Sequence, residues 1–453
     1  MSKPRIAWFC PDPRLVKAAG YPVAHYFSEQ IIPHLKSIYE IEIFSNGFGS
    51  EAFESLDVPV SNYLRAFEVH QKNPFDLFFY QIENSRASDF IRIHMALEPG
   101  VTLFHDFILS DFGPEPILNS PWRDVCARFN HQQLAQPDLA WEANDKKHEP
   151  AGPIAYREAA MSWVSIFSNP NFVGDYGREI RQKLAEPSVY ALPMPVSICA
   201  KQVAVDNLEL NEQQKLTVLF CGAPRGEYRA PALLAALAKK SIKSKLIWLL
   251  DSHELQQAQD LASEFAALEI EFIEGRTPAR WNELVQQSGA VCIHTLFSFY
   301  CNASPYLEIS IAAGRPCIVT DFGFSDSLPE TVVYKVGMGA SEVRELEAVL
   351  QTIAKNLSVL GASSAAANFA TEEFSSVKVA DELNRIFTHE LPRLRLLSEG
   401  WKSLQANARA QLYRQAEAQL LGSDDILKTL ATDYAQDVFN HKTLSATMIG
   451  GGK

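Results

Sequence analysis

The sequence predicts an α/β protein with two doubly wound parallel sheets, one after the other, and a helical extension at the C-terminal end. Short apolar runs alternate with longer amphipathic stretches, which is the pattern of buried parallel strands separated by helices. The alternation pauses once, near the middle of the chain, between residues 194 and 215. The length of 453 residues also favours two or three domains.

The first half contains six apolar runs that we interpret as strands. They cover residues 5–10, 41–45, 76–82, 101–106, 163–168 and 189–193. Amphipathic segments at residues 22–35 and 173–186 are predicted to be helices between them. Residues 1–195 are therefore expected to form a Rossmann-like first domain. Residues 196–215 show no clear period and end in a polar cluster, so we interpret them as a linker.

The second half repeats the alternation. Its predicted strands cover residues 216–222, 245–250, 270–275, 290–295, 316–321 and 332–336. Helices are predicted at residues 230–241 and 253–268, and residues 216–374 are expected to form a second domain of the same class. Residues 375–453 are predicted to be helices that cross back or extend. They either brace the first domain or form a dimer interface.

The composition argues against several classes of protein. A formal charge of −13 disfavours a broad nucleic-acid-binding surface and a strongly basic membrane-binding face. The seven cysteines never stand in CxxC spacing, which argues against a disulfide framework and a structural zinc site. No apolar run approaches the ~18–20 residues of a membrane span. We therefore expect a cytoplasmic protein that binds no nucleic acid, and peripheral association with the inner membrane face stays open.

The stretch ASPYLEISIAAGRPCIVTDFG, residues 303–323, predicts a short helix followed by a buried strand. Ser304 is expected to cap the helix through its hydroxyl, with Pro305 at the first helical position and Gly314 at the left-handed C-terminal position. Helices that follow parallel strands begin at the carboxyl edge of the sheet, so this helix start could hold an anion such as phosphate. The alternative is a crossover helix that binds nothing.

A second candidate anion site follows the first strand of the second domain, in LFCGAPRGEYRAPALLAAL, residues 219–237. Gly222 and Gly226 permit a tight turn, and Arg225 and Arg229 stand in the loop before the next helix. Arginine makes forked contacts to phosphate oxygens. Together with the helix start at Ser304, this loop predicts a diphosphate held at one edge of the sheet. Alternatively, both arginines are solvated loop residues.

These motifs also resemble those of a known protein family. The order GAPRGEYRAPALLAAL, IEFIEGRTPARWNELVQQSGAVCIH, LEISIAAGRPCIVTDFGFSDSLP resembles the C-terminal half of GT-B glycosyltransferases of the family-4-like group. In the first half, DLFFYQIENSRASDFIRIHMALEPGVTLFHDFIL is similar to the acceptor-side domain of that group, where a Y-x-I-x-N strand end precedes a helix and a strand closing in His-Asp. The similarity covers residues 1 to 390, roughly, and leaves the tail unexplained.

The resemblance implies roles for residues on the donor side. Arg225 and Arg229 match the basic pair that grips the donor diphosphate, although the second is usually lysine. Of the family's E-x7-E pattern only Glu308 is present, six residues before Gly314 where the family usually has five, and Tyr300 stands where the first glutamate would be. The donor-binding residues implied in this way are Gly20, Gly222, Asn302, Ala303, Ser304 and Glu308.

In the first domain, which is expected to face the donor domain across a cleft, His105 matches the histidine of the family's His-Asp. That histidine lies beside the transferred sugar. The alternative for His105 is a strand-end histidine bonded to backbone, and Asp106 caps or orients the following loop. Gly20 matches a glycine-containing loop near the donor phosphate, or is an ordinary turn glycine. The implied catalytic residues are thus His105, Arg225 and Arg229.

The activity implied by the resemblance is that of a hexosyltransferase that retains the anomeric configuration and needs no metal ion. Two arginines and a helix start would stabilise the departing nucleoside diphosphate electrostatically. The donor base and sugar cannot be read from the sequence, and the acceptor is a saccharide, a glycolipid or a protein. Two alternatives stay open: a nucleotide-sugar epimerase, and a non-catalytic GT-B-fold partner or scaffold protein. A homodimer is also left open.

Overall fold

The structure is a computed structural model. The residues that it describes are 3–15, 22–47, 49, 51–83, 86–106, 158–159, 161–170, 173, 188–197, 215–224, 228–239, 243–287, 291–294, 304–355 and 361–419. The helix predicted at 173–186 and most of the predicted linker lie outside these residues.

The first domain is built on a parallel sheet with the strand order β3-β2-β1-β4-β5-β6-β7. Its strands are β1 (Arg5–Phe9), β2 (Glu40–Ser45), β3 (Val60–Asn62), β4 (Leu77–Ile82), β5 (Val101–Phe104), β6 (Val164–Phe167) and β7 (Ser188–Ala191). All six predicted strands are confirmed. The sequence pattern missed β3, because it has only three half-buried residues at the edge of the sheet.

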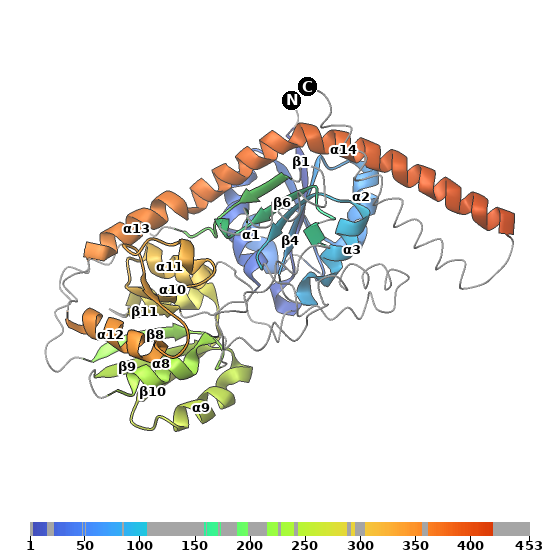
Figure 1. Cartoon of the computed structure of the whole chain (residues 1–453). Helices are drawn as coiled ribbons and strands as arrows, with labels where there is room; N and C mark the ends of the chain where they lie inside the picture. The colour runs from blue at the N-terminus through green and yellow to red at the C-terminus, as the bar shows by residue number, and fades with distance from the viewer. Residues whose placement is uncertain are drawn as a thin grey trace.

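Helices connect these strands and cover the sheet (Figure 1). They are α1 (Val23–Leu35), α2 (Ala66–Lys72) and α3 (Asp89–Leu97). Short 3-10 turns lie at Pro13–Leu15, Glu51–Leu56, Tyr63–Arg65 and Arg86–Ser88. The predicted helix at 22–35 is confirmed as α1, which buries Phe27 and Ile31 against the sheet.

The second domain repeats the architecture with the order β10-β9-β8-β11-β12-β13, again parallel. Its strands are β8 (Leu216–Cys221), β9 (Ser244–Leu250), β10 (Glu269–Glu274), β11 (Val291–His294), β12 (Cys317–Thr320) and β13 (Tyr334–Val336). Its helices are α8 (Ala230–Leu237), α9 (Leu255–Ser263), α10 (Pro278–Gln287), α11 (Pro305–Ala312) and α12 (Glu342–Lys355), with 3-10 turns at Ser252–Glu254 and Ser325–Ser327. In each sheet the first strand lies centrally and the chain winds outward on both sides, which is the doubly wound pattern.

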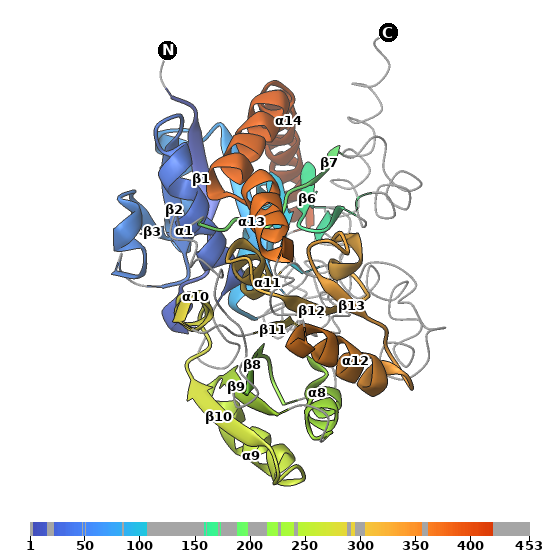
Figure 2. The same cartoon turned by 90° about the vertical axis from the view of Figure 1, so that its left-hand side faces the viewer.

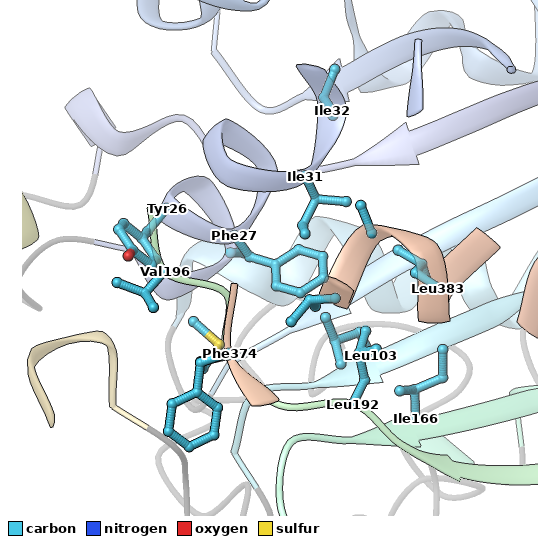
Figure 3. Close-up of a cluster of buried hydrophobic side chains, with 14 of the residues drawn as sticks. Tyr26, Phe27, Ile31, Ile32, Leu103, Ile166, Leu192, Val196, Phe374 and Leu383 are labelled. Atoms are coloured by element: carbon cyan, nitrogen blue, oxygen red, sulfur yellow. The ribbon is translucent and has the colours of Figure 1, made fainter. Parts of the chain in front are cut away.

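The chain crosses between the domains twice, and the two crossings lie side by side. Val196 forms a parallel bridge with Ser375, and the Val196 N–H donates to the Phe374 carbonyl at 2.7 Å. Figure 3 shows the buried cluster around this point, which joins α1, the first sheet and both crossings. The labelled side chains are Tyr26, Phe27, Ile31, Ile32, Leu103, Ile166, Leu192, Val196, Phe374 and Leu383.

The C-terminal segment begins with α13 (Gly361–Glu373) and continues as α14 (Ser376–Gln419), which returns to the first domain (Figures 1 and 2). The Tyr39 hydroxyl donates to Asn384 Oδ1 at 2.7 Å, and the Trp401 indole N–H donates to the Leu97 carbonyl at 2.7 Å. These contacts hold α14 against the first domain as far as Trp401. Of the helices within the described ranges, none is long and apolar enough to cross a membrane.

Candidate functional site

The candidate site lies where the carboxyl edges of the two sheets meet the first turns of three helices. Helix α1 starts at Val23 after β1, α10 at Pro278 after β10, and α11 at Pro305 after β11. Of the residues selected from the sequence, the structure describes His105, Gly222, Arg229, Ser304 and Glu308. The others, Gly20, Arg225, Asn302 and Ala303, lie outside the described residues.

His105 follows β5 directly and is buried, with 2% of its surface exposed. Its backbone N–H donates to the Ile82 carbonyl at 2.9 Å, and its ring packs edge-on against Phe27. Nε2 lies 3.1 Å from the side-chain amide of Gln81, whereas Nδ1 has no hydrogen-bond partner among the described residues. Burial lowers the pKa of His105 to about 3, so its ring is neutral at physiological pH.

Glu83, which the sequence pattern did not single out, follows β4 at the same edge. Its carboxylate accepts a short hydrogen bond from the Ala24 N–H, in the first turn of α1. Burial raises the pKa of Glu83 to about 8; the Ala24 hydrogen bond opposes this rise and the charge of Asp106 adds to it. The start of α1 is therefore already occupied by a carboxyl group of the protein itself.

Arg229 stands immediately before α8 in a left-handed backbone conformation, with φ of 57°. Its guanidinium forms a forked ion pair with Glu342 at the start of α12, and the Arg229 Nε–Glu342 Oε1 distance is 2.7 Å. The pair uses Nε and Nη2, which leaves three of the five guanidinium N–H groups for another acceptor. Arg229 is thus partly buried and held in place, which differs from the alternative of a solvated loop arginine. Its positive charge is paired with the carboxylate of Glu342.

Gly222 directly follows β8 and lies against an aromatic ring. A Cβ atom at this position would come within 2.7 Å of Tyr228 Cδ1. The Gly222 carbonyl accepts a hydrogen bond from the Trp248 indole N–H at 2.8 Å. The glycine is therefore required by the close approach of Tyr228, one residue before Arg229.

A partly buried charged cluster at the neighbouring strand ends also went unrecognised in the sequence. Arg276 follows β10 and Gly275, and its Nη2 lies 2.7 Å from Asp251 Oδ2 and 3.5 Å from Glu254 Oε1. The Tyr306 hydroxyl, in α11, donates to the Arg276 carbonyl at 3.3 Å. The only sequence signal was an arginine directly after a predicted strand that ends in glycine. This cluster ties the ends of β9 and β10 to the start of α11.

Helix α11 begins at Pro305 as predicted, and Gly314 takes the left-handed conformation with φ of 66°. The prediction that the Ser304 hydroxyl caps this helix was wrong, because the side chain of Ser304 makes no capping hydrogen bond. The Ser304 carbonyl instead accepts hydrogen bonds from the N–H groups of Leu307 and Glu308. The side chain therefore leaves the N-terminal end of α11 uncapped.

Glu308 lies in the first turn of α11 with no exposed surface. Neither carboxyl oxygen has a hydrogen-bond partner among the described residues. Burial raises the pKa of Glu308 well above its ordinary value, which favours the neutral form of the carboxyl group. The next residue, Ile309, faces a cavity between the domains.

This interdomain cavity has a volume of about 440 Å³. Its described lining includes one anionic side chain, Glu29, and neither lysine nor arginine. The lining residues are Tyr26, Glu29, Gln30, Val196, Ser197, Thr277, Pro278, Ala279, Asn282, Gln286, Ile309, Ala312 and Ala313. Its volume is in the range of small-molecule sites, and amide and hydroxyl groups dominate its polar lining. Within the described residues, no group of three or more His, Cys, Asp or Glu side chains is arranged to hold a metal ion.

No protein-family model and no curated protein sequence matches the chain. Solved structures do resemble it. A sucrose-phosphate synthase from Thermosynechococcus elongatus is 13% identical with a TM-score of 0.59, over 86% of this chain and 100% of that one. Anabaena HepE in complex with UDP-glucose is 12% identical with a TM-score of 0.59, over 85% and 99% of the two chains.

A glycosyltransferase from Rickettsia africae is 14% identical with a TM-score of 0.56, over 86% of this chain and 99% of that one. Each of these likenesses extends over both sheets and nearly the whole of the other protein. They confirm, at the level of fold, the resemblance found in the sequence motifs. The chain therefore has the GT-B fold, with two Rossmann-like domains and a cavity between them.

Proposed function

We propose that the protein transfers a sugar from a nucleotide-sugar donor to an acceptor, with retention of configuration and without a metal ion. The observation that carries the proposal is the pairing of two features at one edge of the second sheet. Arg229 stands at the start of α8 with free N–H donors, and α11 begins nearby without a side-chain cap. Both features are suited to an anion.

The donor diphosphate would lie between these two helix starts, with Arg225 as a second cation. As the bond between sugar and phosphate breaks, negative charge grows on the departing diphosphate. Fixed N–H dipoles and guanidinium groups stabilise that charge without reorganisation of solvent. The start of α1 is a poorer phosphate site because Glu83 already occupies it.

The uncharged nucleoside of the donor would occupy the interdomain cavity. The cavity adjoins the start of α10, next to Arg276, and its lining supplies the amide groups of Asn282 and Gln286. A lining without lysine or arginine in the described residues is unsuited to phosphate but suits a base and a ribose. His105, on the opposite sheet, would then face the sugar.

A thermal-shift titration with UDP, GDP, CMP, ADP and TDP tests the donor site. We expect one nucleotide to stabilise the protein, and Arg225→Ala and Arg229→Ala to remove most of that shift. Arg280→Ala is the matched control, because Arg280 is exposed and its ion pair within the described residues is with Glu283 in the same helix. An equal shift in all variants would contradict the diphosphate position.

Transfer from the matching nucleotide-sugar distinguishes the remaining functions. A non-catalytic partner protein is favoured by one observation, the burial of Glu308 away from the cavity. Such a protein would bind the nucleotide but neither transfer nor hydrolyse the sugar. An epimerase would convert the donor to its epimer, so the product separates it from a transferase. The acceptor classes to test are saccharides, glycolipids and proteins.

A further inference from the structure

We propose that Gln81 is a positioning residue that holds His105 in the tautomer with its hydrogen on Nδ1. His105 would then offer the substrate a hydrogen-bond donor and could not act as a general base. This inference deepens the proposed sugar transfer, on which its functional part rests. The tautomer itself can be measured without activity.

Gln81 lies in β4 with no exposed surface, although the strand around it is apolar. A fully buried amide is costly unless its hydrogen-bonding groups are paired. Four polar groups surround it: the Trp8 indole N–H, the Ser28 hydroxyl, the Ala24 carbonyl and His105 Nε2. Gln81 therefore connects β1 and α1 to the histidine at the end of β5.

The surrounding groups determine the orientation of the amide. With its nitrogen toward His105, the amide donates to His105 Nε2 at 3.1 Å and to the Ala24 carbonyl at 3.2 Å. Its oxygen then accepts from the Trp8 indole at 3.0 Å and lies 2.9 Å from the Ser28 hydroxyl. Both amide hydrogens are used in this orientation, and the amide oxygen accepts from the Trp8 indole; the single hydroxyl hydrogen of Ser28 goes either to Gln81 or to the Ala24 carbonyl, 2.8 Å away. In the opposite orientation the amide nitrogen can donate to the Ser28 hydroxyl at 2.9 Å, but it also faces the Trp8 N–H at 3.0 Å, and the amide oxygen faces the Ala24 carbonyl at 3.2 Å. A donor then faces a donor and an acceptor faces an acceptor.

This orientation decides the chemistry of the histidine. Because Nε2 of His105 accepts a hydrogen from Gln81, the hydrogen of the neutral ring must be on Nδ1. Nδ1 is buried and has no hydrogen-bond partner among the described residues, so its N–H is left for a ligand. The backbone bond to Ile82 and the contact with Phe27 fix the position of the ring.

The chemical consequence concerns which role His105 can play. A ring with its hydrogen on Nδ1 and its only lone pair bonded to Gln81 cannot remove a proton from an acceptor. It can donate to a sugar hydroxyl or to a phosphate oxygen. Loss of a donor aimed at developing charge typically lowers kcat by about 10²-fold.

Nitrogen NMR on protein labelled with ¹⁵N-histidine tests the tautomer directly. Long-range ¹H–¹⁵N correlations distinguish the protonated from the unprotonated ring nitrogen, and the spectrum of His105→Gln identifies the His105 signals. We expect a neutral ring protonated on Nδ1 in the wild-type protein without ligand. A ring protonated on Nε2, or an even mixture of the tautomers, would overturn the proposal whether or not transfer is observed.

Two variants of Gln81 then test its positioning role. Gln81→Glu has no amide hydrogen, so it should move the ring hydrogen to Nε2 and lower kcat about 10²-fold with a much smaller change in KM for the donor. Gln81→Met fills similar space without hydrogen bonds and should give mixed tautomers. Gln257→Glu, at an exposed position of α9, is the control for the substitution itself.

The outcomes separate the two proposals. Unchanged tautomer and kcat in Gln81→Glu would refute the positioning role even if sugar transfer is confirmed. Absence of any transfer by the wild-type protein would refute the proposed function while leaving the tautomer measurement valid. If both Gln81 variants fail to fold, the wild-type spectrum still decides the tautomer.

Discussion

Replacing Arg229 by alanine should destabilise the protein more than replacing Glu342 by glutamine, because the two partners are unequally buried. The Glu342 side chain is 5% exposed and that of Arg229 is 22% exposed. Arg229→Ala leaves a buried carboxylate without its cation, which typically costs about 3–5 kcal/mol. The dipole of α12 offsets up to about 1 kcal/mol of this cost. Glu342→Gln keeps a neutral acceptor beside a guanidinium that reaches solvent, so we expect a loss of about 1–2 kcal/mol.

Urea denaturation of the two single variants and the double variant measures the coupling. We expect a coupling energy of about 2–3 kcal/mol, which exceeds the loss in Glu342→Gln and makes the double variant more stable than Arg229→Ala alone. The exposed Arg280–Glu283 pair is the matched control and should couple by about 0.5 kcal/mol at most. Additive effects at Arg229 and Glu342, or a larger loss in Glu342→Gln than in Arg229→Ala, would refute the burial argument.

Three further predictions follow from the geometry. Gly222→Ala should destabilise the protein by about 1–3 kcal/mol in urea denaturation, because the new Cβ would lie 2.7 Å from Tyr228 Cδ1. Burial lowers the pKa of His94 to about 4, below its unfolded value of about 6.5, so its contribution to stability is complete above pH 6.5 and is lost as the pH falls toward 4. The free energy of unfolding of His94→Phe, measured by urea denaturation, should therefore fall less steeply than that of the wild type as the pH is lowered from 6.5 to 4. Ala312→Trp should fill the interdomain cavity and weaken nucleotide binding by about tenfold or more, measured by calorimetry.

Two of these predictions have a control variant, and the pH prediction is corrected for an opposing group. Gly400→Ala lies in α14 with open space around the new Cβ, and should stabilise the protein by up to about 1 kcal/mol. Glu83, with its raised pKa, acts in the opposite direction and loses stability as the pH rises from 4.5 to 8, so the histidine effect is measured as a difference between variant and wild type. Ala262→Trp, half-buried on α9 outside the cavity, should leave nucleotide binding unchanged.

The fold was largely predictable because each central strand is a continuous apolar run. Strands such as β4 and β12 are buried along their whole length, which leaves a strong local pattern. The edge strand β3 has no such pattern, because half-buried residues at an edge can be polar or apolar. The single long helix α14 was predicted only as helical, since its continuation past Pro392 depends on packing against the first domain.

The partners of the site residues were not predictable from local sequence. Arg229 and Glu342 are 113 residues apart, and nothing in the sequence near Arg229 indicates that a carboxylate from α12 will form an ion pair with it. The cap expected at Ser304 follows a local rule, but the first turn of α11 bonds to the Ser304 carbonyl and leaves the hydroxyl unused. Gln81 gave only a weak signal, a single polar residue within an apolar strand.

The position of Glu308 shows how one residue of register changes a site. In an α-helix each residue is rotated by about 100° from the one before, so a shift of one position moves a side chain from one face to another. The glutamate stands six residues before Gly314, and its carboxyl is buried without a partner among the described residues. Ile309, five residues before Gly314, faces the interdomain cavity instead. A ribose bound there would meet an apolar side chain at this point, so its hydroxyls would depend on other groups of the lining, such as Asn282 and Gln286.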